Sequence, residues 1–150
     1  MKIHMRDLEK AKELLEKNNL TLSIVKNGKI IFESSSHGIG GFLTAIKKLD
    51  NQLEDASVAD KIAGKAIALL CAYSKVQNVY ALILSRSAKL LFEEYAVHCE
   101  WDQLVENILD ATGEDACPFE KLAKKISDPN EAYRKFKALQ TSLNIVDEDR

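Results

Sequence analysis

The sequence predicts an α/β domain in which a mixed β-sheet lies between two layers of helices. Two observations support this class. Alternating apolar residues on both sides of Asn27-Gly28 indicate a β-hairpin, and an apolar strand at 78–84 leads directly into a helical pattern. A hairpin joined to strand–helix units gives a sheet with antiparallel and parallel neighbours, covered by helices on both faces.

The first part of the chain has clear periodicities. Apolar residues recur at helical spacing after Met5, and the period then changes to the alternation of strands. The predicted order is a helix at 5–17, strands at 20–24 and 29–33, a loop at 34–41 and a helix at 42–49.

The second part begins with a pattern typical of a helix start. Ser57 and Asp60 have the spacing of a capping box, and the stretch from Ile62 to Tyr73 is apolar except for Lys65, which predicts one long buried helix from about Val58. The rest is predicted as a strand at 78–84, a helix at 86–96, a strand at 97–101 and helices opened by Pro118 and Pro129, the latter capped by Asp128. The pattern predicts no definite element for residues 104–116.

Length and charge limit the function classes. With 150 residues the chain is long enough for one domain, predicted over 1–145, followed by a disordered acidic tail at 146–150. The net charge of −2 provides no field that would attract nucleic acid or an anionic membrane, so neither is expected as a partner. No targeting segment, spanning stretch or disulfide framework is evident, and we expect a cytoplasmic protein of undefined oligomeric state, a homo-oligomer being compatible with it.

Short strings spread over nearly the whole chain resemble those of one known family. They are Ala59-Asp60-Lys61, Gly64-Lys65-Ala66, Leu69-Leu70, Val79-Tyr80-Ala81 before Ser85, Thr112-Gly113, Cys117-Pro118-x-Glu120 and Asp128-Pro129-x-Glu131-Ala132. In this order they resemble a small prokaryotic family of domains of unknown function. The resemblance implies a cytidine-deaminase-like fold, in agreement with the predicted elements, but fold alone does not give function. The sequence departs from the family at Asp110-Ala111, where an Asn-Arg pair is expected.

The ligands of a zinc deaminase are missing. That chemistry needs a His or Cys ligand with a Glu two residues later, and a Pro-Cys-x-x-Cys pair. His98-Cys99-Glu100 matches by letter only, because it lies on a predicted strand, and Cys117 is not part of a cysteine pair. The layout implied by the resemblance places the zinc motifs near 60–65 and 85–87, which contain no His or Cys. We therefore expect no metal site and no cofactor.

Lys65 is the most informative candidate. As the only charge between Ile62 and Tyr73 it is expected to be partly desolvated, which suits a lysine that binds an anion or acts as a base or nucleophile. The alternative is a structural lysine that reaches solvent or pairs with Asp60 or Glu120. Lys61 lies one turn earlier on the predicted helix and is expected in the same cleft or in solvent.

Cys117 is the second catalytic candidate. It precedes Pro118 at the N-cap of a predicted helix, where the helix dipole lowers the pKa of a thiol and favours a thiolate nucleophile. Glu120, at the third helical position, opposes that shift or completes a capping box. A purely structural cap is the other interpretation of Cys117.

Two loops suggest anion contacts. Ser36, His37, Gly38, Gly40 and Gly41 precede a helix, where glycine amides can approach an anion and His37 can act as acid or base, although a tight turn also explains the glycines. Ser85 ends the apolar strand, a position where ligands bind in open α/β sheets.

Three functions therefore compete. The first is a module that binds a small anionic or nucleotide-like ligand around Lys65 without zinc chemistry. The second is an enzyme without zinc that uses Lys65 with Cys117 or His37. The third is a structural or protein-interaction domain.

Overall fold

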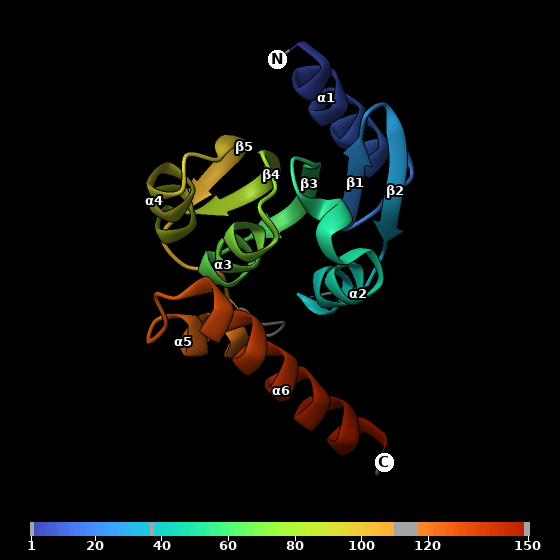
Figure 1. Ribbon diagram of the computed structural model, residues 1–150. Helices are drawn as coiled ribbons and strands as arrows, with labels where there is room; N and C mark the ends of the chain where they lie inside the picture. Colours follow the sequence, from blue (N-terminus) through green and yellow to red (C-terminus); the bar gives the residue numbers. More distant parts are fainter. Residues whose placement is uncertain (1, 37, 110–116, 149–150) are drawn as a thin grey trace.

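The computed structural model describes residues 2–36, 38–109 and 117–148, which form a sheet with helices on both faces (Figure 1). The elements, in order, are α1 (Lys2–Lys17), β1 (Leu22–Lys26), β2 (Lys29–Ser34), α2 (Gly40–Leu49), a 3-10 turn (Asp50–Leu53), β3 (Ser57–Ala63), α3 (Lys65–Ser74), β4 (Asn78–Ser85), α4 (Arg86–Glu94), β5 (His98–Val105), α5 (Pro118–Ala123) and α6 (Pro129–Glu148).

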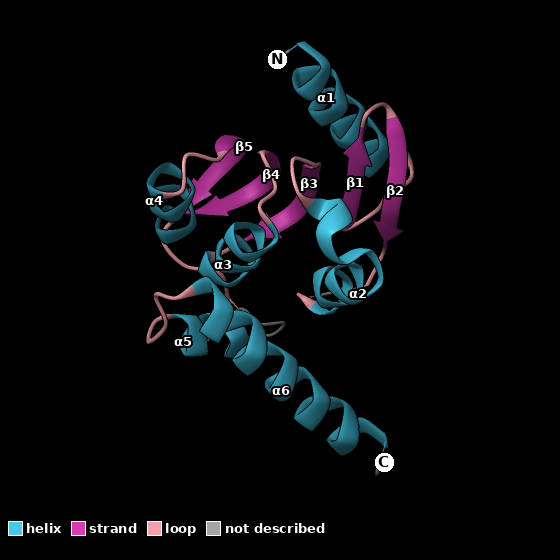
Figure 2. Cartoon of the chain, in the orientation of Figure 1, coloured by secondary structure: helices cyan, strands magenta, loops and turns pink. Residues whose placement is uncertain are grey.

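The sheet is mixed, as the sequence predicts (Figure 2). Its five strands lie in the order β2-β1-β3-β4-β5. Strand β1 is antiparallel to β2 and to β3, whereas β3, β4 and β5 are parallel to one another. Because β3, β4 and β5 are parallel, their carboxyl ends lie at the same end of the sheet, and α3 and α4 begin there.

The predicted hairpin is present, and helix α1 holds its turn. Asn27 and Gly28 have φ values of 52° and 77°, the left-handed region that a type I′ turn requires at both positions. The buried Asp7 carboxylate on α1 accepts both turn amides at 2.9 Å. Helix and hairpin are therefore joined by charge-assisted hydrogen bonds as well as by apolar packing.

The two faces of the sheet carry separate cores. Helix α1 covers one face, where its apolar stripe packs on residues of β1, β3 and β4; this cluster is Leu8, Ala11, Leu15, Val25, Ala59 and Tyr80. The other face carries the larger core, formed with residues of the remaining helices, among them Phe42, Leu69, Leu70, Phe92 and Phe136. Neighbouring residues such as Val58 and Ala59 belong to different cores because strand side chains alternate between faces. The α/β class with three layers is thus confirmed.

The predicted helix start near Val58 is wrong. Residues 57–63 form β3, and Ser57 accepts a hydrogen bond from the Asn78 side chain at 3.2 Å instead of capping a helix. A central strand covered on both faces is buried at consecutive positions, so its alternation is lost and it resembles a buried helix. Helix α3 begins only at Lys65, after Gly64.

The other elements agree more closely. Strand β5 continues to Val105, past the predicted end, and Asp128 caps α6 through the Glu131 amide at 3.0 Å. The acidic composition predicts a disordered tail from position 146, whereas the helical backbone of α6 continues through positions 146–148. Positions 149–150 and 110–116, including the departure at Asp110-Ala111, lie outside the described residues. Within the described part of the chain, no helix is both long and apolar enough to cross a membrane.

Candidate functional site

A cleft of about 330 Å³ opens at the carboxyl ends of the parallel strands, where α3 and α4 begin. Four separate segments contribute polar side chains to it; these include Lys65, Ser85, Arg86, Glu106, Glu120 and Lys124. Its volume is at the lower end of the range for small-molecule sites. The parallel strand order brings these segments together although they are up to 59 positions apart in the sequence. We call it the α3–α4 cleft.

The start of α3 is occupied by a carboxylate from α5. The two oxygens of Glu120 accept the backbone N–H groups of Lys65 at 2.8 Å and of Ala66 at 2.7 Å. A Cβ atom at position 64 would overlap the Glu120 carboxylate, so this approach requires glycine. Helix α3 therefore receives its N-terminal anion from within the chain.

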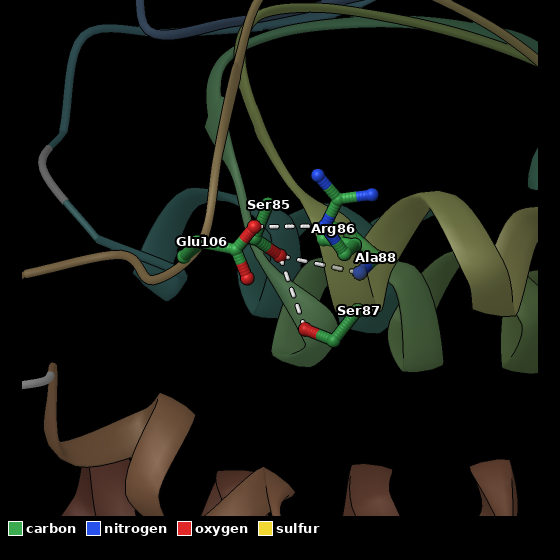
Figure 3. Close-up of polar contacts among 5 residues, drawn as sticks. All are labelled: Ser85, Arg86, Ser87, Ala88 and Glu106. Carbon is green, nitrogen blue, oxygen red and sulfur yellow. Dashed lines mark hydrogen bonds and ion pairs between the residues drawn. The ribbon is translucent and has the colours of Figure 1, made fainter.

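The start of α4 is organised locally. Ser85 is the N-cap, its hydroxyl oxygen accepts the Ala88 amide at 3.2 Å, and it lies 3.2 Å from the Ser87 hydroxyl (Figure 3). The same view shows Arg86 joined to Glu106 from the end of β5, with Nε 2.8 Å from a carboxylate oxygen. Both charged side chains are more than half exposed, at 56% and 71%. The serines thus face the cleft beside a neutralised ion pair.

Two carboxyl groups near the start of α3 have raised pKa values. Burial raises the pKa of Glu120, although the two amides and the ammonium groups of Lys65 and Lys124 offset part of this effect. Burial also raises the pKa of Asp60, on β3, to about 7, against the hydrogen bonds from the Ile62 and Lys61 amides. Lys65 and Lys124 therefore share the cleft with a carboxyl group, Glu120, that already has hydrogen-bond partners.

Three of the predicted site residues meet in this cleft: Lys65, Ser85 and Glu120. The prediction that Lys65 lies inside a buried helix is wrong, because it is the first residue of α3 and is half-buried. Sequence reasoning missed Arg86, Ser87, Glu106 and Lys124. The strand–helix junction after Ser85 was a usable signal for the first two, whereas nothing local marks the last two.

The other predicted ligand residues lie elsewhere. Ser36, Gly40 and Gly41 line a second cavity between α2 and α6, whereas Gly38, with a φ of 71°, is not among its lining residues. Lys61 lines a third cavity beside α1, because its side chain points to the opposite face of β3 from that of its neighbour Asp60.

The remaining candidates are Asp60, Cys117 and His37. Asp60 is buried and not among the cleft residues, and His37 lies outside the described residues. Cys117 is the N-cap of α5 as predicted, but its side chain makes no capping hydrogen bond and does not line the cleft. Of the alternatives open for Glu120, a capping box on α5 is not the one observed, because its carboxylate accepts the amides of α3.

The donor set for a metal ion is poor. In the described part of the chain, no group of three or more His, Cys, Asp and Glu side chains is placed to hold a metal ion. His98 and Glu100 pair at 2.7 Å on the exposed edge strand, away from the cleft. The absence of zinc remains a prediction for metal analysis.

The comparisons with known proteins agree with the sequence resemblance. The profile of the domain of unknown function DUF1893 matches residues 10–139. The chain belongs to this family. A crystal structure of a DUF1893 family protein from Thermotoga maritima is 33% identical, covers 89% of both chains and superposes with a TM-score of 0.82.

Two solved deaminases are similar at a lower level. The dCMP deaminase of cyanophage S-TIM5 has 14% identity and a TM-score of 0.46, over 67% of this chain and 97% of its own. The deaminase/reductase of Thermotoga maritima, named for diaminohydroxyphosphoribosylaminopyrimidine and 5-amino-6-(5-phosphoribosylamino)uracil, has 16% identity and a TM-score of 0.45, over 79% and 40%. At these levels neither match bears on the chemistry of this chain. No protein of curated function matches it significantly.

Proposed function

We propose that this DUF1893 domain binds a small anionic ligand in the α3–α4 cleft and does so without zinc. The observation that carries the proposal is the meeting of Lys65, Lys124 and the Ser85–Ser87 turn in one cavity at the carboxyl ends of β3 and β4. Two ammonium groups supply the charge, and serine hydroxyls supply short-range hydrogen bonds to anionic oxygens.

The two acidic side chains that line the cleft, Glu106 and Glu120, already have hydrogen-bond partners. Glu106 is paired with Arg86, and the carboxylate of Glu120 accepts two amides of α3. Lys65 and Lys124 offset part of the charge of Glu120, and among the described residues the three cations that line the cleft still outnumber its two carboxylates by one. The strand ends of an open α/β sheet are also where ligands bind in many unrelated proteins.

The enzyme alternative has less support. It needs Lys65 to act with Cys117 or His37, and Cys117 does not line the cleft. A ligand held by ammonium and hydroxyl groups requires no reacting nucleophile, so binding without turnover accounts for the described residues more simply.

The test is a calorimetric titration of the protein with inorganic phosphate and with a nucleoside monophosphate. Lys65→Met keeps the apolar stem and removes the charge, and we expect affinity to fall about tenfold, the loss of one charge-assisted hydrogen bond. The matched control is Lys125→Met, because Lys125 is exposed, close to Lys124 in the chain, and does not line the cleft.

The control variant separates binding in the cleft from an effect of net charge. If Lys65→Met and Lys125→Met lose the same affinity, the loss reflects only the lower net charge of the protein and the proposal is rejected. It is also rejected if no anion binds at millimolar concentration. Metal analysis after dialysis checks the zinc-free part, which fails if one zinc per chain is found.

A further inference from the structure

A second groove lies between α2 and α6, separate from the α3–α4 cleft. Its volume is about 480 Å³, and the two cavities share no lining residue. One face of each helix forms its walls, and the end of β2 forms its floor. The groups used below are Ser34, Ser36, Gly40, Lys47 and Lys137. We call it the α2–α6 groove.

The charge of this groove differs from that of the whole chain. The sequence has 23 acidic and 21 basic residues, yet no acidic residue is among the described residues that line the groove. It is lined instead by Lys47 and Lys137 together with hydroxyl and amide side chains. In the α3–α4 cleft, by contrast, carboxylates stand among the cations. Cations without neighbouring carboxylates favour an anionic occupant.

The floor of the groove is held in place by hydrogen bonds. The Thr21 hydroxyl lies 3.1 Å from the Ser34 carbonyl and 2.7 Å from that of Ser36, and the Ser36 amide donates to the Ser34 hydroxyl oxygen at 3.1 Å. The last bond uses a lone pair of the Ser34 oxygen and not its hydrogen. A Cβ atom at Gly41 would come within 2.9 Å of that oxygen, so the first turn of α2 packs closely on the floor.

Both walls of the groove carry positive groups, and those of α2 are spread along its axis. Lys47 lies two turns after Gly40 on the same face of α2, roughly 10 Å along the helix axis. Across the groove, the Lys137 ammonium lies 5.5 Å from the Tyr133 ring centroid, a contact that orients it. Ile39, at the N-cap of α2, has no side-chain atom that could cap the first amides, so the helix start adds a partial positive charge.

We propose that the α2–α6 groove is a second binding site, for a small molecule with two or more linked phosphoryl groups. Groups spread over about 10 Å suit an extended polyanion better than a single phosphate. This site is independent of the function proposed above, because it shares no residue with the α3–α4 cleft.

The test uses the Lys65→Met protein, in which anion binding by the first cleft is expected to be about tenfold weaker, and titrates it with pyrophosphate and with inorganic phosphate. We expect pyrophosphate to bind about tenfold more tightly than phosphate, because two linked phosphoryl groups can meet more of the groove's donors than one can. Lys47→Met and Lys137→Met should each weaken pyrophosphate about fivefold, the value of one exposed charge pair. Lys48→Met is the matched control, since Lys48 is exposed on α2 but does not line the groove.

Amide chemical shifts locate the bound anion. On pyrophosphate addition the amides of Gly40 and Gly41 should move, and those of Ser87 and Ala88 should not. Shifts confined to the start of α4, equal weakening by Lys48→Met, or no binding of pyrophosphate would each overturn the second site. None of these outcomes decides whether the wild-type α3–α4 cleft binds an anion, which the Lys65→Met comparison tests by itself.

Discussion

Helices α3 and α4 begin next to each other, at the ends of adjacent parallel strands, but their first amides are satisfied in different ways. At α3 the acceptor is the Glu120 carboxylate, 55 positions away from Lys65. At α4 the acceptor is the Ser85 hydroxyl, 3 positions before Ala88. One helix start thus depends on tertiary structure and the other on its own sequence.

The carboxyl groups near the two helix starts also differ in their burial. Near the start of α3, Asp60 and Glu120 are carboxyl groups whose pKa values are raised by burial. At the start of α4 the carboxylate is Glu106, which is 71% exposed and paired with Arg86. The comparison teaches that pH and long-range packing should control the α3 region, whereas the α4 region should respond to local changes.

The largest effect is expected from Asp60. Burial raises the pKa of its carboxyl group from the ordinary value of 3.8 to about 7, so the folded state binds the proton more tightly than the unfolded state. This contribution to stability is fully present below pH 3.8 and is lost as the pH rises through about 7. Between pH 5 and pH 8 it should remove about 3 kcal/mol from the free energy of unfolding.

Asp60→Asn stays neutral and should lose most of this pH dependence, measured by urea unfolding at both pH values. Glu106→Gln serves as the control, because Glu106 is an exposed carboxylate and its removal should leave the dependence unchanged. Identical pH profiles for wild type and Asp60→Asn would refute the assignment.

The next effect concerns Gly64, which allows Glu120 to reach α3. Gly64→Ala should lower the free energy of unfolding by about 2–3 kcal/mol, because the new methyl group displaces a carboxylate that makes two charge-assisted hydrogen bonds. The backbone at Gly64 has φ −106°, so the alanine itself is not strained.

A double-mutant cycle separates this loss from a simple effect of the methyl group. With Glu120→Ala already present, Gly64→Ala should cost only about 0.5–1 kcal/mol, the difference between Gly and Ala at an ordinary N-cap. Additive losses would show that Gly64 and Glu120 do not act together.

The same contrast explains what the sequence could predict. The hairpin turn at Asn27-Gly28, the Asp128 cap and the position of Ser85 depend on residues within a few positions, and all three predictions are confirmed. For Glu120 the sequence leaves open a capping box on its own helix α5 and a pairing with Lys65, and the structure shows that it binds the Lys65 and Ala66 amides across the fold. Strand β3 was missed because burial on both faces hides its period.

The candidate site follows the same rule. Lys65 and Ser85 were predicted from their own positions in the sequence, whereas Glu106 and Lys124 became site residues only through the parallel strand order. In the loop before α2, where the sequence predicts anion contacts, Ser36, Gly40 and Gly41 line the α2–α6 groove and not the cleft. Local patterns identified groups suited to an anion and did not show which of them share a cavity.

A smaller effect is expected at Ser85. Ser85→Ala removes the acceptor of the Ala88 amide and should lower the free energy of unfolding by about 1 kcal/mol, the usual value of an N-cap. Ser85→Thr retains the hydroxyl and should recover most of the loss in thermal unfolding. Because the cap is local and carries no charge, the loss should be equal at pH 5 and pH 8, whereas a loss that varied with pH would link Ser85 to the buried carboxyl groups.

The smallest effect is expected from the pair of Arg86 and Glu106. Their Nε–Oε1 distance is 2.8 Å, but side chains that are 56% and 71% exposed are strongly screened by water. A cycle of Arg86→Met and Glu106→Gln should give a coupling energy of about 0.5 kcal/mol in low salt. The coupling should disappear in about 1 M salt, where the Debye length is about 3 Å. A coupling of about 2 kcal/mol that persists in salt would mean that the pair is shielded, and the start of α4 would then depend on tertiary electrostatics in the way that α3 does.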